Sequence, residues 1–131
     1  MSIKAPDINA NYLQIRDIEI VRGDTFALNV RMLTNGAPSM LTESGRVTFA
    51  VFDRVKNTVI KKIYGSGNQT ETGYINILLL PSETATLKKL NAYEYELEWL
   101  VNSSTIYTLL QGKIKVIDEK ITTTVRSDAN A

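Results

Sequence analysis

The clearest pattern in the chain is an alternation of apolar and acidic residues between positions 93 and 101. The apolar set at odd positions and the glutamates at even positions are Tyr93, Tyr95, Leu97, Trp99 and Val101 against Glu94, Glu96 and Glu98. Side chains of a β-strand point alternately to the two faces of its sheet. The pattern therefore predicts a strand with one buried face and one row of solvated glutamates.

Shorter alternations of the same kind predict further strands, about eight in all. We place the others at residues 14–21, 26–32, 47–51, 59–64, 74–80, 106–110 and 113–117, with a bulge or bend at Gly112. Asn35-Gly36 between two of them favours a tight turn. One helix of one or two turns is expected near residues 82–90, because Ser82-Glu83-Thr84 resemble a helix N-cap with acid in the first turn.

Short strands without crossover helices between them predict an all-β fold, an immunoglobulin-like antiparallel β-sandwich of about 7–8 strands. Tyr93 follows a short helical link, as does the tyrosine corner of immunoglobulin-like domains, whose hydroxyl bonds upstream backbone. We divide the chain into an extended N-terminal arm (1–13), the sandwich (14–117) and a polar C-terminal tail (118–131). The first and last strands, residues 14–21 and 113–117, are the expected sheet edges.

Composition narrows the possible chemistry. The 131 residues include 15 Lys and Arg against 14 Asp and Glu, and neither Cys nor His. A near-neutral charge gives no reason to expect nucleic acid or a membrane surface as partner. Lack of Cys and His removes thiol nucleophiles, His-based triads and the usual zinc ligands. We expect no catalytic, cofactor or metal site, and, without an apolar N-terminal region, no secretory signal.

Two polar motifs have a functional and a structural interpretation. Arg22-Gly23-Asp24 matches the integrin-binding tripeptide, but the same residues make an ordinary turn, which we favour. The row Glu94, Glu96 and Glu98 offers carboxylates to a cation or to glycoside hydrolysis. A flat row diverges, so we favour a solvated face, with cross-strand partners among Lys61, Lys62, Lys113 and Lys115.

The aromatic residues raise a second alternative. Exposed in a groove, Tyr93, Tyr95 and Trp99 would form the platform of a carbohydrate-binding module, but they share a face with Leu97 and Val101, so we expect them in the core. Tyr64, Tyr74 and Tyr107 are less determined and are candidates for the surface. An enzyme would require a deep pocket that brings together two of four acidic residues: Glu43, Asp53, Glu71 and Glu83.

The order of turn and core motifs resembles a known family. These motifs are Ile20-Val21-Arg22-Gly23-Asp24-Thr25-Phe26, Gly36-Ala37-Pro38, Val47-Thr48-Phe49-Ala50-Val51, Thr72-Gly73-Tyr74-Ile75, Leu80-Pro81-Ser82-Glu83, Ala92-Tyr93-Glu94-Tyr95 and Leu110-Gln111-Gly112-Lys113. Across residues 15–117 the chain is similar to the N-terminal domain of phage baseplate upper proteins and related siphophage structural proteins. That resemblance implies an immunoglobulin-like sandwich that docks to a virion.

The resemblance implies a non-enzymatic structural protein, made in the host cytoplasm and located in the virion. Family members usually continue into a helical stalk, whereas this sequence ends at Ala131. We therefore expect a stand-alone relative attached to a baseplate, tail, neck or capsid. The expected partners are other virion proteins and further copies of the chain; a host-surface glycan belongs to the alternative of a carbohydrate-binding adhesion domain.

Overall fold

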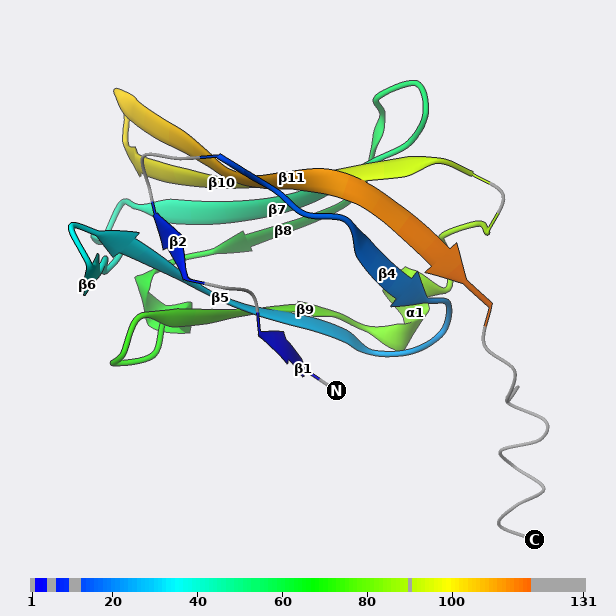
Figure 1. Cartoon of the computed structure of the whole chain (residues 1–131), viewed down its shortest axis with the longest axis horizontal. Helices are drawn as coiled ribbons and strands as arrows, with labels where there is room; N and C mark the ends of the chain where they lie inside the picture. The colour runs from blue at the N-terminus through cyan, green and yellow to red at the C-terminus, as the bar shows by residue number, and fades with distance from the viewer. Residues whose placement is uncertain (1, 5–6, 10–12, 90, 119–131) are drawn as a thin grey trace, which may run out of the picture.

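Two β-sheets stacked face to face hold nearly all the regular structure of this computed structural model (Figure 1). The structure describes residues 2–4, 7–9, 13–89 and 91–118. The long strands of both sheets pair antiparallel, and the parallel pairings are those of the short strands before residue 22. The predicted all-β sandwich is confirmed.

The first sheet is built on β5. This strand pairs antiparallel with β9 and β6 and parallel with β1 and β2. The bounds are β1 (Ser2–Lys4), β2 (Ile8–Asn9), β5 (Phe26–Thr34), β6 (Ala37–Pro38) and β9 (Tyr74–Leu79). The turn between β5 and β6 is formed by Asn35 at φ 52° and Gly36 at φ 80°. Positive φ at both central residues is what a tight hairpin turn requires, so the predicted turn is confirmed.

The second sheet has the order β3-β11-β10-β7-β8, with β4 also pairing with β11. The bounds are β3 (Gln14–Ile15), β4 (Ile18–Val21), β7 (Arg46–Phe52), β8 (Thr58–Tyr64), β10 (Tyr93–Asn102) and β11 (Thr105–Ile117). β7 pairs with β10, and β5 pairs with β9, so the connections cross between the two sheets. Such crossing connections are typical of Greek-key sandwiches of the immunoglobulin type.

Two expectations about the last strand are wrong. Residues 106–110 and 113–117 form one strand, β11, and Gly112 lies within it opposite Tyr95. The irregularity is a bulge at Leu109, because Leu97 faces Leu110 whereas Glu98 faces Thr108. Residues 113–117 are not an edge, because β4 pairs parallel with them on the side opposite β10. The edges of this sheet are β8 and the β3–β4 segment, so the expectation for residues 14–21 is confirmed.

The core follows the alternation seen in the sequence. Tyr93, Tyr95, Leu97 and Trp99 are buried, and Val101 is half-buried and packs against the same cluster. The Phe49 and Tyr95 rings meet with their centres 5.6 Å apart. The facing layer consists of alternate residues of the first sheet: Phe26, Leu28, Val30, Met32, Ile75, Ile77 and Leu79. Side chains from both sheets therefore fill a single core.

The helix expected at residues 82–90 is shorter and starts earlier. α1 spans Pro81–Thr84, with Leu80 as N-cap and Pro81 as the first helical residue. The Glu83 carboxylate accepts a hydrogen bond from the Leu80 backbone N–H at 2.9 Å, which completes the cap. The Arg22 guanidinium donates hydrogen bonds to the carbonyl oxygens of Ala85 and Leu87. In a longer helix these carbonyl groups would accept from backbone N–H groups further along the chain. Besides α1, the described residues contain a 3₁₀ turn at Ser66–Asn68.

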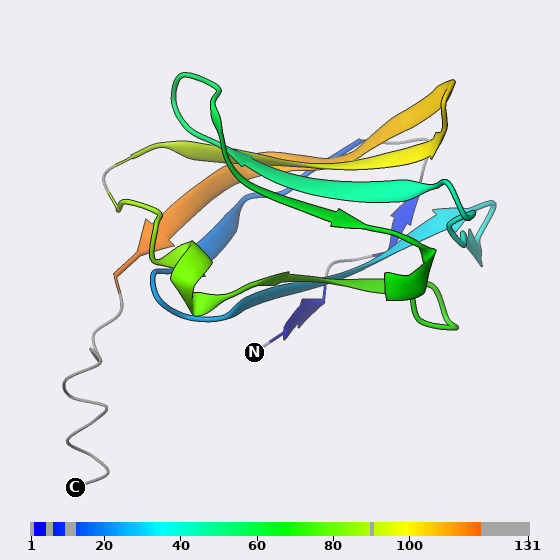
Figure 2. The same ribbon diagram turned by 180° about the vertical axis from the view of Figure 1, so that it is seen from behind.

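Side chains from β8 join the two sheets along the side of the sandwich where β8 and β9 lie near each other (Figure 2). The Leu78 backbone N–H donates to the Tyr64 hydroxyl at 3.0 Å, and Lys62 Nζ lies 2.7 Å from Glu83 Oε2. Burial alone would raise the pKa of Glu83, but the Leu80 N–H and the Lys62 ammonium hold it below its ordinary value. A charged side chain between the sheets at an edge strand also discourages pairing with another chain.

Part of the predicted N-terminal arm is strand. β1 and β2 lie parallel to β5, and the Ile8 side chain is fully buried in the core. The remaining arm residues (1, 5–6 and 10–12) lie outside the described residues, as does the predicted tail beyond Asp118. Within the described part of the chain, the helices are too short to cross a membrane.

Candidate functional site

The tripeptide Arg22-Gly23-Asp24 is a turn that is fixed against α1. Beyond the contacts of Arg22 with Ala85 and Leu87, the Gly23 N–H donates to Thr84 Oγ1 at 3.0 Å. The Thr84 hydroxyl in turn donates to the Asp24 carbonyl at 2.7 Å. Gly23 has φ 81°, which glycine adopts without strain. The turn interpretation is confirmed, because these residues are committed to the fold and not displayed on a free loop.

The three aromatic residues of β10 lie in the core, as expected, and not in the exposed platform that was the alternative. Tyr95 is 2% exposed and Trp99 7%, and Tyr93 is buried beside them. The Trp99 ring packs on Tyr107 with centres 5.8 Å apart, and Trp99 Nε1 has no hydrogen-bond partner among the described residues. These rings are core residues, as the alternation indicated, and offer no face to a sugar. Three further tyrosines, which we considered candidates for the surface, are half-buried: Tyr64, Tyr74 and Tyr107.

Tyr93 occupies the predicted tyrosine corner. Its hydroxyl accepts a hydrogen bond from the Lys88 backbone N–H at 3.0 Å, five residues upstream. Asn91 Nδ2 lies 3.4 Å from the same oxygen. The architectural analogy to immunoglobulin-like domains is therefore confirmed at this position.

The glutamate row lies on the outer face of the second sheet, as predicted, but its partners differ. Glu94 Oε1 pairs with Lys56 Nζ at 2.9 Å, and Glu96 Oε2 accepts from Gln111 Nε2 at 2.9 Å. Gln111 is the cross-strand neighbour of Glu96 in β11. Of the four lysines proposed as partners, Lys62 instead reaches Glu83 between the sheets. Lys56 was missed because a loop, not strand register, brings it to the row.

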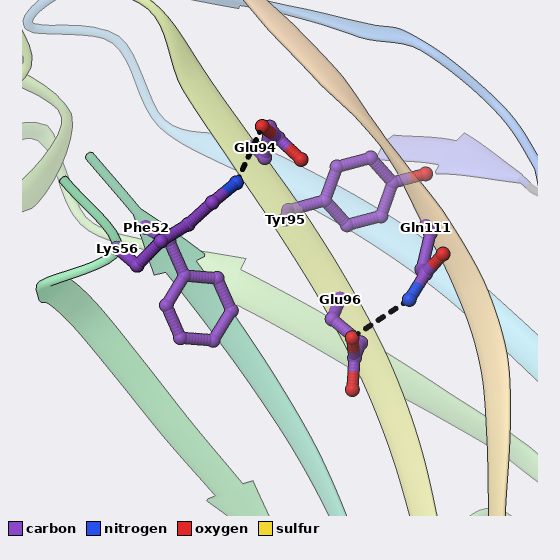
Figure 3. Close-up of a pocket in the computed structure, with 6 residues that line it drawn as sticks. All are labelled: Phe52, Lys56, Glu94, Tyr95, Glu96 and Gln111. Carbon is purple, nitrogen blue, oxygen red and sulfur yellow. Dashed lines mark hydrogen bonds and ion pairs between the residues drawn. The ribbon is translucent and has the colours of Figure 1, made fainter. Parts of the chain in front are cut away.

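Phe52, Lys56 and Gln111 line a hollow of about 330 Å³ beside Glu94 and Glu96 (Figure 3). A second hollow of about 220 Å³ adjoins it and shares Phe52 and Glu96. The lining of the second hollow also includes Thr48, Ala50, Thr58, Lys61 and Glu98. Ala50 and two threonines are small residues, which leaves room between the Phe52 ring and the glutamates. The loop between β7 and β8, which carries Lys56, projects above the sheet in both views of the ribbon (Figures 1 and 2).

The four carboxylates considered for an enzyme lie apart from these hollows. Asp53 accepts from the backbone N–H groups of Val55 and Asn57 and so shapes the loop between β7 and β8. Glu83 belongs to α1, and Glu43 and Glu71 are exposed on separate loops. None of the four lines either hollow. Within the described residues, no three acidic side chains converge as a metal site would require.

The backbone of Arg16, between β3 and β4, is hydrogen-bonded to Tyr95 of β10 and to Gln111 of β11. The Tyr95 hydroxyl donates to the Arg16 carbonyl at 2.6 Å, and the Arg16 N–H donates to the Gln111 carbonyl at 2.8 Å. The Asp17 carboxylate then accepts from the Lys113 N–H at 2.9 Å. These hydrogen bonds hold Arg16 and Asp17, which connect β3 to β4, against β11. Burial raises the pKa of Tyr95 to about 12; Arg16 opposes the rise and Asp17 adds to it.

Replacing Tyr95 by phenylalanine will lower the free energy of unfolding by about 1 to 2 kcal/mol near neutral pH, because the Arg16 carbonyl loses its donor. The pKa of Tyr95 in the folded protein, about 12, exceeds that of an unfolded tyrosine, ~10. The neutral hydroxyl therefore contributes its full stabilisation below about pH 10, and this contribution is lost as the pH rises towards 12. The difference between wild type and Tyr95→Phe should therefore shrink over this interval. Urea denaturation at several pH values measures it.

Tyr107→Phe is the matched control, since the Tyr107 hydroxyl has no hydrogen-bond partner among the described residues and its ring is half-buried. We expect this variant to unfold close to wild type. Equal costs for Tyr95→Phe and Tyr107→Phe would contradict the role assigned to the bond with Arg16.

Three residues that line the hollow were not singled out in the sequence: Phe52, Lys56 and Gln111. The sequence contains a signal for the first of them. Val47, Phe49 and Val51 were expected to face inward, which by alternation places Phe52 on the outer face, where a large aromatic side chain is unusual. Gln111 follows only from the register with Glu96. No local pattern indicates that Lys56 reaches Glu94, since the two residues meet through the folded loop.

The sheet order and register define an all-β sandwich of the immunoglobulin type. Among the described residues, no other element packs across the outer face of its second sheet. Comparison with known proteins adds little. No protein-family model and no curated protein match the sequence. Among solved structures, the chain is similar to the N-terminal domain of the phage TP901-1 protein ORF48, with a TM-score of 0.48 and 8% identity over 85% of this chain and 94% of that chain. Strand order and register define the fold, and this similarity indicates no function.

Proposed function

We propose that the chain is a non-enzymatic structural component of a phage virion that acts through protein–protein docking. The resemblance of its turn and core motifs to baseplate upper proteins supports the virion as its location. The observation that carries the docking role is the outer face of the second sheet. No other described element of the chain packs across this face, which combines exposed isoleucines with the glutamate row.

Strand register places three large aliphatic side chains on this outer face. Ile15 is the neighbour of Gln111, Ile63 of Thr48, and Ile106 of Leu100. Their exposed fractions are 70%, 54% and 55%. Interfaces between proteins that also exist apart combine apolar with polar and charged groups, and this face has such a composition.

Repetition in a particle would make such a surface effective. A single contact of mixed polarity is weak, but copies that are linked through a shared assembly bind with an avidity far above that of one contact. Lys62 and the Tyr64–Leu78 bond protect the β8 side from uncontrolled strand addition. The face, more than the strand edge, is therefore the surface we propose for docking to other virion proteins or to further copies of the chain.

Mass spectrometry of purified phage particles tests this proposal. We expect the chain to be present in a constant ratio to the major structural proteins after gradient purification, while an abundant host cytosolic protein is removed. An infection complemented with the Ile63→Asp/Ile106→Asp variant should give particles that contain less of the chain, because charge on the face opposes docking. Absence of the wild-type chain from particles, although it is present in the lysate, would contradict the proposal.

A further inference from the structure

The hollow of about 330 Å³ on the outer face is built from groups of complementary chemistry. One wall is the ring of Phe52, and the other carries the carboxylates of Glu94 and Glu96 with the amide of Gln111 (Figure 3). It lies at the lower end of the ~300–1,000 Å³ range of small-ligand pockets. That size fits one long side chain and is too small for several sugar rings.

The charge of the hollow and its neighbour favours a cation. Three carboxylates, those of Glu94, Glu96 and Glu98, stand against two ammonium groups, those of Lys56 and Lys61, which leaves an excess of one negative charge. Within the described residues, Glu98 makes no hydrogen bond or ion pair. An aromatic face attracts cations as well, so Phe52 and the carboxylates act in the same direction.

We propose that this hollow binds an arginine side chain of a partner protein; the inference rests on the proposed docking function and names the chemistry of its partner. A guanidinium group is planar, so it stacks on an aromatic ring and at the same time donates two parallel hydrogen bonds to one carboxylate. Phe52 supplies the ring and Glu96 the carboxylate, and both line the two hollows. A lysine ammonium is a compact, strongly hydrated charge and uses the ring less well.

Lys56 competes with the incoming arginine. Its ammonium lies 2.9 Å from Glu94 Oε1, and both side chains of this pair are more than half exposed. Exposed ion pairs are weak, so the Lys56 side chain can leave Glu94 when a better-placed cation arrives. It follows that removal of the Lys56 charge should strengthen binding of arginine, whereas it should weaken binding of any anionic ligand. This opposite sign separates the two classes of ligand.

Titration of the ¹⁵N-labelled full chain with N-acetyl-arginine amide, followed by NMR, tests the inference. We expect saturable shifts of the amides of Glu94, Glu96 and Gln111 in the millimolar range, and much smaller shifts with N-acetyl-citrulline amide, which has the same shape without the charge. Glu96→Gln and Phe52→Ala should each weaken binding roughly tenfold, while Lys56→Gln strengthens it. Glu71→Gln, the same change on a separate exposed loop, is the matched control and should leave binding unchanged.

Three results would overturn the inference: equal shifts with arginine and citrulline amides, no shifts at these positions, or saturable shifts at the same positions with methyl glycosides in place of arginine. Circular dichroism and urea denaturation show that each variant is folded before its titration is read. If arginine binds as expected but the chain is missing from particles, the hollow is a guanidinium site and the virion assignment fails. If the chain is in particles and arginine does not bind, the docking role stands and the partner chemistry fails.

Discussion

Gly112→Ala will destabilise the domain by about 3 kcal/mol, which for a single methyl group is a large effect. A Cβ atom at this position would lie 2.0 Å from the Arg16 carbonyl oxygen and 2.6 Å from the carbonyl carbon. Both atoms are backbone, so no side-chain rotation relieves the contact. The β3–β4 segment must move away from β11, and the hydrogen bond from Tyr95 to Arg16 is lost with it. The free energy of unfolding from urea denaturation measures the effect.

Gly67→Ala is the matched control for this substitution. A Cβ at Gly67 meets no atom within 4 Å, and its backbone is not in the left-handed region. There the same change should be neutral or stabilise by up to about 1 kcal/mol, because alanine has less conformational freedom in the unfolded chain. Near-equal stability of the two variants would show that the Arg16 carbonyl does not lie against Gly112 of β11. The slope of the denaturation curve should stay unchanged if only the native state is affected.

Phe49→Ala will lower the free energy of unfolding by about 3 to 5 kcal/mol, since it leaves a large cavity in the middle of the core. Phe49 is fully buried on β7 and packs against Tyr95, with which it shares the centre of the sandwich. It lies opposite Leu97 of β10, itself fully buried, so the neighbouring side chains are held by strand pairing and cannot close the gap. Thermal and urea denaturation should report the same loss.

Phe52→Ala, three residues along the same strand, is the control for that variant. Phe52 is half-buried on the opposite face of β7, where it lines the hollow. Its removal should cost roughly 1 kcal/mol or less, because solvent already reaches the site and no cavity forms. Equal costs for Phe49→Ala and Phe52→Ala would contradict the assignment of inner and outer faces, and with it the position of the proposed arginine site.

The two faces of the second sheet therefore have separate roles. The inner face supplies stability through buried rings and aliphatic side chains, whereas the outer face keeps acidic, basic and apolar groups in contact with solvent. Variants on the outer face should change binding with little effect on folding, and variants on the inner face should do the reverse. This separation allows the docking proposal to be tested without loss of the fold.

The sequence by itself determined which residues of the long strands face the core, because alternation along a strand is a local property of the backbone. Residues 93 to 101 were assigned correctly for this reason, as were the Asn35-Gly36 turn and the role of Tyr93. The sequence did not indicate that Ile8, in the predicted arm, is buried in the core as well. Register and strand order depend on contacts between segments far apart in the sequence. Only the tertiary structure could therefore show that β4 pairs with residues 114–117, that Arg22 donates to the carbonyl groups just after α1, and that Lys56 reaches Glu94. The hollow beside Phe52 was hidden for the same reason, since three strands and a loop must come together before its walls exist.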